Sequence, residues 1–146
     1  MSKIITKKMI KDYQELGVVY IPNLFKKHVS NLKKGIEFNL NNPGPYAAEN
    51  LRKKENGRFF DDYCNWERIP EFRKTIFDND IITAAAKLMQ SQSVQLFHDH
   101  VLVKEPGTSK DTPWHSDGPY YFINGKKTIS FWVPLDPVKE ASLRMV

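Results

Sequence analysis

The feature that most constrains the fold of this chain is a change in hydrophobic pattern near Ser93. Before that point, apolar side chains mostly recur every three or four positions, which is typical of amphipathic helices. After it, short runs rich in β-branched and aromatic residues are separated by Gly, Pro and Asn-Gly turns, which is typical of strands. These runs lie at 94–104, 112–116, 120–123 and 128–134. The pattern predicts an α+β fold in which helices pack on a carboxyl-terminal sheet, within a single domain of residues 1–146.

The amino-terminal part is expected to contain four helices and two short strands. Thr6 can cap the first helix, and Gly17 can end it in a left-handed conformation. The other helices are expected at 29–40, at 70–77 and from 79 or 80 to 89, the strands at 18–21 and 58–63, and a polar loop at 46–57.

Composition excludes several classes of protein. The 146 residues are 40% hydrophobic and 27% charged, as in ordinary globular domains and unlike disordered or fibrous chains. The longest apolar runs are far shorter than the roughly 18 residues that a membrane span needs, so we expect no membrane crossing. The single cysteine, Cys64, cannot form an intramolecular disulfide, and no signal-peptide pattern follows Met1. We therefore expect a cytoplasmic protein.

The net charge of +5 makes nucleic-acid binding one function to consider. The 22 Lys and Arg residues are dispersed along the chain, beside acidic residues, Asn or turns, as on ordinary solvated surfaces. We therefore expect no nucleic-acid partner. A basic nucleic-acid-binding domain stays as an alternative, and salt-dependent binding of DNA or RNA would support it.

The sequence Trp-His-Ser-Asp-Gly at 114–118 is the sharpest chemical motif. In extended chain, His115 and Asp117 share one face, where an imidazole nitrogen and a carboxylate oxygen can occupy neighbouring positions on one metal ion. Two His and one carboxylate form the facial triad that holds Fe(II) in oxygenases. Such a pair arises by chance in roughly half of chains with this composition, and Asp-Gly is also a common hairpin turn. Spacing alone therefore leaves a structural turn as the alternative.

A second polar group lies upstream, where alternation on an expected strand places His98, His100, Leu102 and Lys104 on one face. His98 and His100 could bind a metal as a His-x-His pair, although exposed or hydrogen-bonded histidines are the simpler interpretation. Several aromatic residues further along are expected to form the core of the sheet, or else to wall a metal site off from water. These are Tyr120, Tyr121, Phe122, Phe131 and Trp132.

Together these segments resemble the phytanoyl-CoA dioxygenase family of Fe(II)- and 2-oxoglutarate-dependent oxygenases. The matching segments are Leu-Phe-His-Asp-His at 96–100, Lys-Glu-Pro-Gly at 104–107, Pro-Trp-His-Ser-Asp at 113–117, Tyr120, and Phe-Trp-Val-Pro-Leu-Asp at 131–136. The resemblance extends to Glu-Leu-Gly at 15–17, Val-Val-Tyr-Ile-Pro at 18–22, and Pro-Glu-Phe-Arg at 70–73. It spans nearly the whole chain, and its combined spacing is far more specific than the His-x-Asp pair alone.

The resemblance implies that His115 and Asp117 are two of three iron ligands. It also implies that His100 and Trp132 contact 2-oxoglutarate. Arg58 falls near a position where family members have a basic residue that assists in this binding. Related halogenases replace the carboxylate by a small residue, so its retention implies hydroxylation. The implied activity is that of a hydroxylase that uses Fe(II), 2-oxoglutarate and molecular oxygen on a small organic or acyl substrate.

Lys104 shares the expected inner face with His100. The resemblance implies that Lys104 either contributes to the charge balance of the cofactor pocket or is a structural residue of the family. Substrate choice is expected to lie in loops such as 46–57.

The resemblance implies a double-stranded β-helix of the cupin or jelly-roll kind, with the amino-terminal helices packed outside. Family members continue past a Gly-x-Leu-like segment, here Ala141 to Arg144, to a second His ligand and an Arg that binds the far carboxylate of 2-oxoglutarate. In this sequence no His follows His115. We therefore expect an incomplete jelly roll with weak iron binding and self-association through unpaired strand edges. A non-catalytic binding module on the same fold is the alternative.

Overall fold

A computed structural model of the chain describes residues 4–51, 56–109, 111–123, 125–138 and 143–145. Residues 52–55 of the expected loop and 141–142 of the Gly-x-Leu-like segment lie outside this description. The α-helices are α1 (Lys7–Leu16), α2 (Val29–Asn41), α3 (Pro70–Ile76) and α4 (Asn79–Leu88). The strands are β1 (Ala48–Glu49), β2 (Phe59–Tyr63) and β3 (His100–Lys104), and the 3-10 helices are η1 (Lys26–His28) and η2 (Gly118–Tyr120). The α+β expectation is confirmed, and no described helix is long and apolar enough to cross a membrane.

Local capping explains where the first helix begins and ends. The Thr6 side chain accepts a hydrogen bond from the Met9 N–H at 3.1 Å, as the expected cap should. Gly17 adopts φ +74° and donates its N–H to the Tyr13 carbonyl, which closes the last turn. Both expectations for this helix are confirmed.

The third and fourth helices follow each other closely, and a proline and an aspartate define their starts. Pro70 occupies the first turn of α3, where the missing N–H costs nothing. Asp78 caps α4 by accepting the Asp80 N–H at 2.9 Å. The expected cap at Asn79 or Asp80 is thus wrong by one or two residues, because Asp78 is the last residue with extended dihedral angles.

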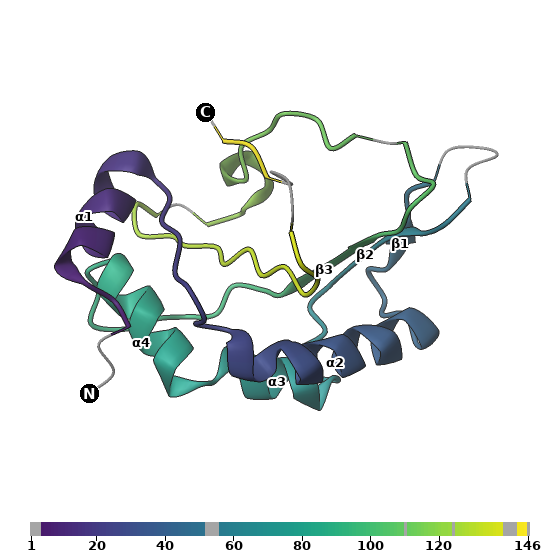
Figure 1. Cartoon of the computed structure of the whole chain (residues 1–146), viewed down its shortest axis with the longest axis horizontal. Coiled ribbons are helices and arrows are strands. Elements are labelled where there is room, and N and C mark those ends of the chain that lie inside the picture. Colours follow the sequence, from purple (N-terminus) through teal and green to yellow (C-terminus); the bar gives the residue numbers. More distant parts are fainter. Residues whose placement is uncertain (1–3, 52–55, 110, 124, 139–142, 146) are drawn as a thin grey trace.

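The sheet is antiparallel with the strand order β1-β2-β3. Its inner face carries Phe60, Asp62 and Val101 toward α2 and α3, which lie side by side beneath it (Figure 1). On the outer face, the register pairs Tyr63 with His100 and Phe59 with Lys104. The predicted alternation of β3 is confirmed, because Val101 is buried while His100, Leu102 and Lys104 are exposed.

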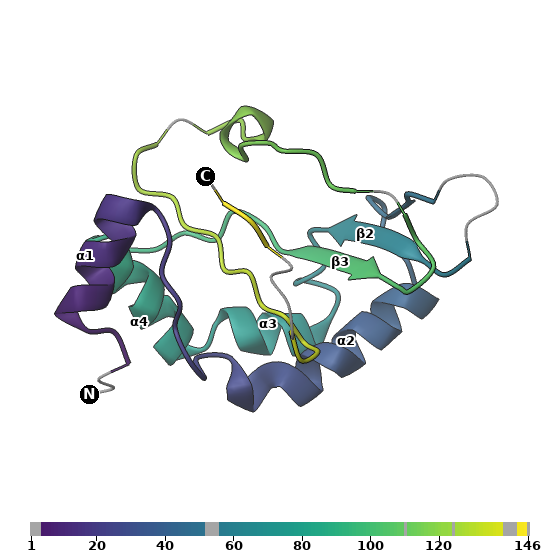
Figure 2. The same cartoon turned by 45° about the horizontal axis from the view of Figure 1, so that its top comes forward.

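Two apolar clusters hold the layers together. The first cluster joins the amino-terminal segment, α1 and α4, and its buried members are Ile5, Leu24, Ile81, Ala84 and Leu88. The second cluster joins the sheet to α3, and its buried members are Phe60, Ile69, Phe72 and Val101. The helices therefore support one face of the sheet and leave the other to the segment that follows β3 (Figure 2).

Four expected strands do not form in the described residues. The segments 18–21, 112–116, 120–123 and 128–134 have no strand assignment, and only residues 100–104 of the segment 94–104 pair. A strand requires a partner for its backbone groups, and after Lys104 the chain leaves the sheet. The expected loop at 46–57 also contains the short strand β1.

Gly35 permits the close approach of α2 and α3, and we expect Gly35→Ala to destabilise the fold. A Cβ there would lie 2.6 Å from Cε1 of Phe72, a buried ring that has no room to move aside. Alanine normally favours a helix by about 1 kcal/mol over glycine, but overpacking costs about 1–3 kcal/mol. We expect a net loss of up to about 2 kcal/mol in urea unfolding.

The matched control is Gly125→Ala, where an added Cβ would meet no atom within 4 Å. This variant should have the same urea midpoint of unfolding as the wild type. A Gly35→Ala chain more stable than the wild type by about 1 kcal/mol, the full gain in helix propensity, would show that the two helices are not in the contact described.

Candidate functional site

The His115 and Asp117 side chains lie together at the start of η2, with 3.4 Å between His115 Nε2 and Asp117 Oδ1. They meet through a turn and not through an extended strand, because Asp117 has helical dihedral angles of φ −68° and ψ −29°. His115 Nδ1 lies 2.8 Å from the Pro113 carbonyl oxygen. A carbonyl only accepts, so Nδ1 carries the hydrogen of this contact, and Nε2 faces the carboxylate.

This donor set fits two adjacent positions on a metal ion. Ligand atoms about 2.1 Å from one ion, at right angles to each other, lie about 3 Å apart. A backbone carbonyl that fixes the other ring nitrogen is the usual support of a metal-binding histidine. Among the described residues, no group of three His, Cys, Asp or Glu side chains could hold a metal ion. The described residues therefore bring His115 and Asp117 together without a third side chain of these types.

His100 lies near this pair, on the outer face of β3. Its ring stacks on Tyr63 with 4.0 Å between centroids and 13° between planes. Partial burial of this ring lowers the pKa of His100, although much of the residue's surface is exposed. The negative charges of Asp61 and Asp117 oppose this shift. Burial raises the pKa of Tyr63, and Asp61 and Asp117 raise it further. The carboxylate of Asp117 thus acts on both stacked rings.

Aromatic side chains surround the stacked rings. His98 contacts Tyr63 at 5.7 Å and Tyr121 at 5.9 Å between centroids, and Phe97 contacts Tyr121 at 4.9 Å. Two other members of this group are open to solvent, since Tyr120 is 74% exposed and Phe122 is 91% exposed. The expectation of a sheet core is therefore wrong for these two residues, because no described strand covers them.

The three other predicted site residues, Lys104, Trp132 and Arg58, lie in three different surroundings. Lys104 shares the outer face with His100, and its Nζ lies 5.2 Å from the centroid of the Phe59 ring. Trp132 is 52% exposed and, within the described part of the chain, makes no hydrogen bond or ring contact.

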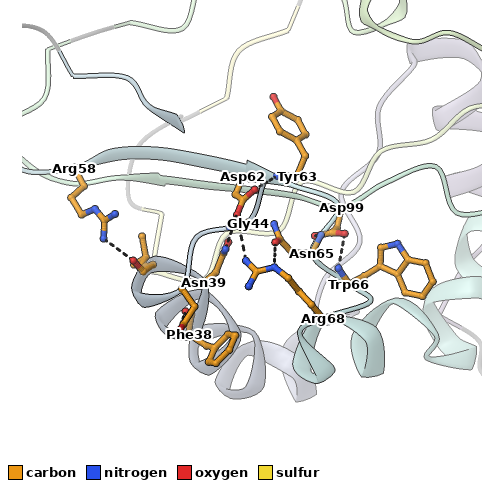
Figure 3. A network of polar contacts seen from close by, with 12 residues as sticks. Phe38, Asn39, Gly44, Arg58, Asp62, Tyr63, Asn65, Trp66, Arg68 and Asp99 are labelled. Carbon is orange, nitrogen blue, oxygen red and sulfur yellow. Dashed lines mark hydrogen bonds and ion pairs between the residues drawn. The ribbon is translucent and has the colours of Figure 1, made fainter. Parts of the chain in front are cut away.

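Arg58 points to the inner side of the sheet, opposite to Tyr63 (Figure 3). It forms an ion pair with Glu49 at 2.6 Å and lies over the ring of Phe60. These contacts place it beside a hollow of about 200 Å³ that is lined by residues of β1, β2 and the loop before them. The structure does not bring Arg58 together with His100.

A buried polar network beneath the sheet was not anticipated from the sequence (Figure 3). Asp62, which has no exposed surface, accepts hydrogen bonds from the side chain of Asn39 at 2.8 Å and from the Gly44 N–H at 2.7 Å. Burial alone would raise the pKa of Asp62, but hydrogen bonds from Asn39, Gly44, Asn65 and Tyr63 outweigh it, so the pKa is lowered. The signal available in the sequence was Phe60-x-Asp62 on one strand face, which places an acid beside a core residue.

A second aspartate of this network, Asp99, holds the chain that leaves β2. Its two carboxylate oxygens accept the N–H groups of Asn65 at 3.1 Å and Trp66 at 3.0 Å. Its carbonyl accepts the Cys64 N–H at 3.0 Å. The end of β2 is therefore tied both to the helix layer and to the segment that enters β3.

Comparison with known proteins assigns the chain to a class of enzymes. The family model described as phytanoyl-CoA dioxygenase (PhyH) matches residues 13–145. The chain belongs to the phytanoyl-CoA dioxygenase family, as its sequence resemblance predicts. Family membership indicates an oxygenase of the Fe(II) and 2-oxoglutarate type, which acts with oxygen on a small molecule. No curated protein and no solved structure gives a significant match.

Proposed function

We propose that this chain belongs to an Fe(II)- and 2-oxoglutarate-dependent hydroxylase type that acts on a small organic or acyl substrate. The observation that carries this proposal is the His115–Asp117 pair, with 3.4 Å between the two ligand atoms. A cation between a histidine nitrogen and a carboxylate oxygen that face each other at this distance would be bound by both atoms. In this role both residues would hold the iron.

The metal and its cosubstrate, when bound, supply the oxidising chemistry, while the chain binds and orients them. His100 and Lys104 share the outer face of β3, which places an imidazole and an ammonium group on the face proposed to bind a dicarboxylate such as 2-oxoglutarate. The proposed contacts of Trp132 and Arg58 with this cosubstrate rest on the family resemblance alone.

We further propose that residues 1–146 belong to one domain built on a double-stranded β-helix, with the outer face of β2 and β3 as the inner surface of the roll. The exposed alternate side chains of β3 and the helix layer on the opposite face support this arrangement. A cytoplasmic location, proposed from the single cysteine, would suit an Fe(II) enzyme.

Anaerobic titration with Fe(II) in the presence of 2-oxoglutarate tests the proposed metal site. We expect one ion to bind weakly, because the described chain supplies two protein ligands. His115→Ala and Asp117→Ala should each weaken binding by at least about tenfold, which corresponds to about 1.4 kcal/mol. The charge-transfer absorbance of the bound 2-oxoglutarate would report the titration.

His98→Ala is the matched control, because the His98 ring packs against Tyr63 and Tyr121 and is not one of the two iron ligands proposed here. This variant should bind Fe(II) within about twofold of the wild type. Equal binding by the wild type and His115→Ala would refute the site. Binding of 2-oxoglutarate without any succinate formation by the iron-loaded chain would instead favour the binding-module alternative.

A further inference from the structure

Tyr63 connects the two parts of the candidate site, although neither the family match nor the sequence analysis assigns it a role. Its ring lies parallel to His100, with 4.0 Å between centroids, and its edge contact with His98 has a centroid distance of 5.7 Å. The negative charge of Asp117 is also near enough to raise the pKa of the Tyr63 hydroxyl, in addition to burial and Asp61. Tyr63 is thus the neighbour of a proposed cosubstrate residue and lies close to a proposed iron ligand.

The backbone of Tyr63 is held in place from beneath the sheet. Its N–H donates to Oδ1 of the buried Asp62 at 2.8 Å, and Asp62 is itself bonded to Asn39 and Gly44. The following residue, Cys64, adopts φ +59°, so the chain turns sharply away after Tyr63 (Figure 3). Because the polar network fixes both sides of this position, the Tyr63 ring has a defined place on the outer face.

The fixed Tyr63 ring restricts the orientation of the His100 imidazole that faces it. His100 follows Asp99, whose carboxylate and carbonyl are both engaged, and it pairs in register with Tyr63. A histidine on an open strand face would exchange among several side-chain orientations, and each one lost on binding carries an entropic cost. A parallel ring at 4.0 Å favours one of these orientations before any ligand arrives.

We propose that Tyr63 is a positioning residue of this site, which holds the His100 ring by stacking in the orientation that binds 2-oxoglutarate. This proposal rests on the proposed function, since it is the contact of His100 with the cosubstrate that gives the orientation a purpose. Stacking needs the ring and not the hydroxyl group. Phenylalanine should therefore replace tyrosine, and leucine should not.

The test compares wild type, Tyr63→Phe and Tyr63→Leu in the full chain by NMR. The ring signals of His100, assigned with a His100→Gln variant, are followed while 2-oxoglutarate is added with Zn²⁺ as a redox-inert metal. We expect Tyr63→Leu to weaken 2-oxoglutarate binding roughly two- to tenfold, the range that corresponds to one aromatic pair. Tyr63→Phe should bind within about twofold of the wild type.

A second readout needs no cosubstrate. Nuclear Overhauser contacts between the rings of residues 63 and 100 should be present in the wild type and in Tyr63→Phe. The titratable and charged groups around His100 are Asp61, His98, Asp99, Asp117 and Tyr63, so all spectra are recorded at one pH. Tyr20→Leu is the matched control, because Tyr20 is 82% exposed, and it should leave both readouts unchanged.

The outcomes separate this proposal from the proposed function. Equal 2-oxoglutarate affinity in the wild type and Tyr63→Leu, or a Tyr63→Phe chain as weak as Tyr63→Leu, would overturn the stacking role alone. Absence of ring contacts between residues 63 and 100 in the wild type would do the same. If 2-oxoglutarate leaves the wild-type His100 signals unmoved, the proposed function of His100 fails, and the positioning role fails with it.

Discussion

Replacing Asp62 by alanine should lower the free energy of unfolding by about 3–5 kcal/mol, because it removes the acceptor at the centre of the buried network. The side chain of Asn39 and the backbone N–H of Gly44 both donate to it, at 2.8 and 2.7 Å. Each buried donor left without a partner costs roughly 1–3 kcal/mol. Urea unfolding of the variant and the wild type would measure the difference. Asp62→Asn keeps the shape and one oxygen, so its loss should be smaller.

The pH dependence of this difference distinguishes a charge effect from a loss of packing. The pKa of Asp62 in the folded chain is lowered from its ordinary value of 3.8, so the unfolded chain binds the proton more readily. The stabilisation by the charged form is fully present above the unfolded pKa, and it is lost as pH falls through the lower folded pKa. The stability gap between the wild type and Asp62→Ala should therefore narrow below about pH 4.

Asp136→Ala is the control for removal of an aspartate. Its carboxylate also binds a charged partner, Lys33 at 2.7 Å, but the side chain is 84% exposed. Exposed pairs of this kind contribute at most about 1 kcal/mol. An Asp62→Ala chain that loses no more than this control would contradict a structural role for the network.

The helices could be predicted from the sequence because their signals are local. Thr6 and Gly17 act within one turn of their own positions, and Pro70 begins its helix through its own ring geometry. The strands expected after Lys104 do not form in the described residues, because local signals do not decide strand pairing. Their alternation is present, since Ile129, Phe131 and other odd-numbered residues of 128–134 are less exposed than their neighbours. Alternation indicates an extended chain, but pairing depends on a partner strand elsewhere.

The candidate site could likewise be predicted only where its residues are close in sequence. Spacing of two predicted that His115 and Asp117 would meet, and they do, although a turn brings them together. Asp117 acts on His100 and Tyr63 because of the path that the chain takes after β3. No local sequence pattern predicts that path. Arg58 illustrates the opposite case. Its alignment near a basic family residue gave no information about which face of the sheet it occupies. Arg58, which pairs with Glu49, lies on the inner side (Figure 3).

The path of the chain after β3 can be tested at Phe131, where we expect the second large loss of stability. In Figures 1 and 2 the segment 125–136 runs from α1 toward α2, in agreement with hydrogen bonds from Tyr13 to the Thr128 carbonyl and from Lys33 to Asp136. The ring of Phe131 contacts Phe25 edge-on, with 5.4 Å between centroids, and packs against the cluster of α1 and α4. Phe131 is therefore partly covered by the helix layer, whereas the sequence led us to expect it in the core of the sheet.

Phe131→Ala should lower the free energy of unfolding by about 2–3 kcal/mol, somewhat less than the 3–5 kcal/mol typical of a fully buried phenylalanine. Trp132→Ala is the matched control, because the next residue faces the other way, is 52% exposed and makes no ring contact among the described residues. It should change stability by less than about 0.5 kcal/mol. Urea unfolding of both variants would decide the matter. Equal losses, or a larger loss for Trp132→Ala, would mean that the segment does not rest on the helices and that its apolar side chains have another partner.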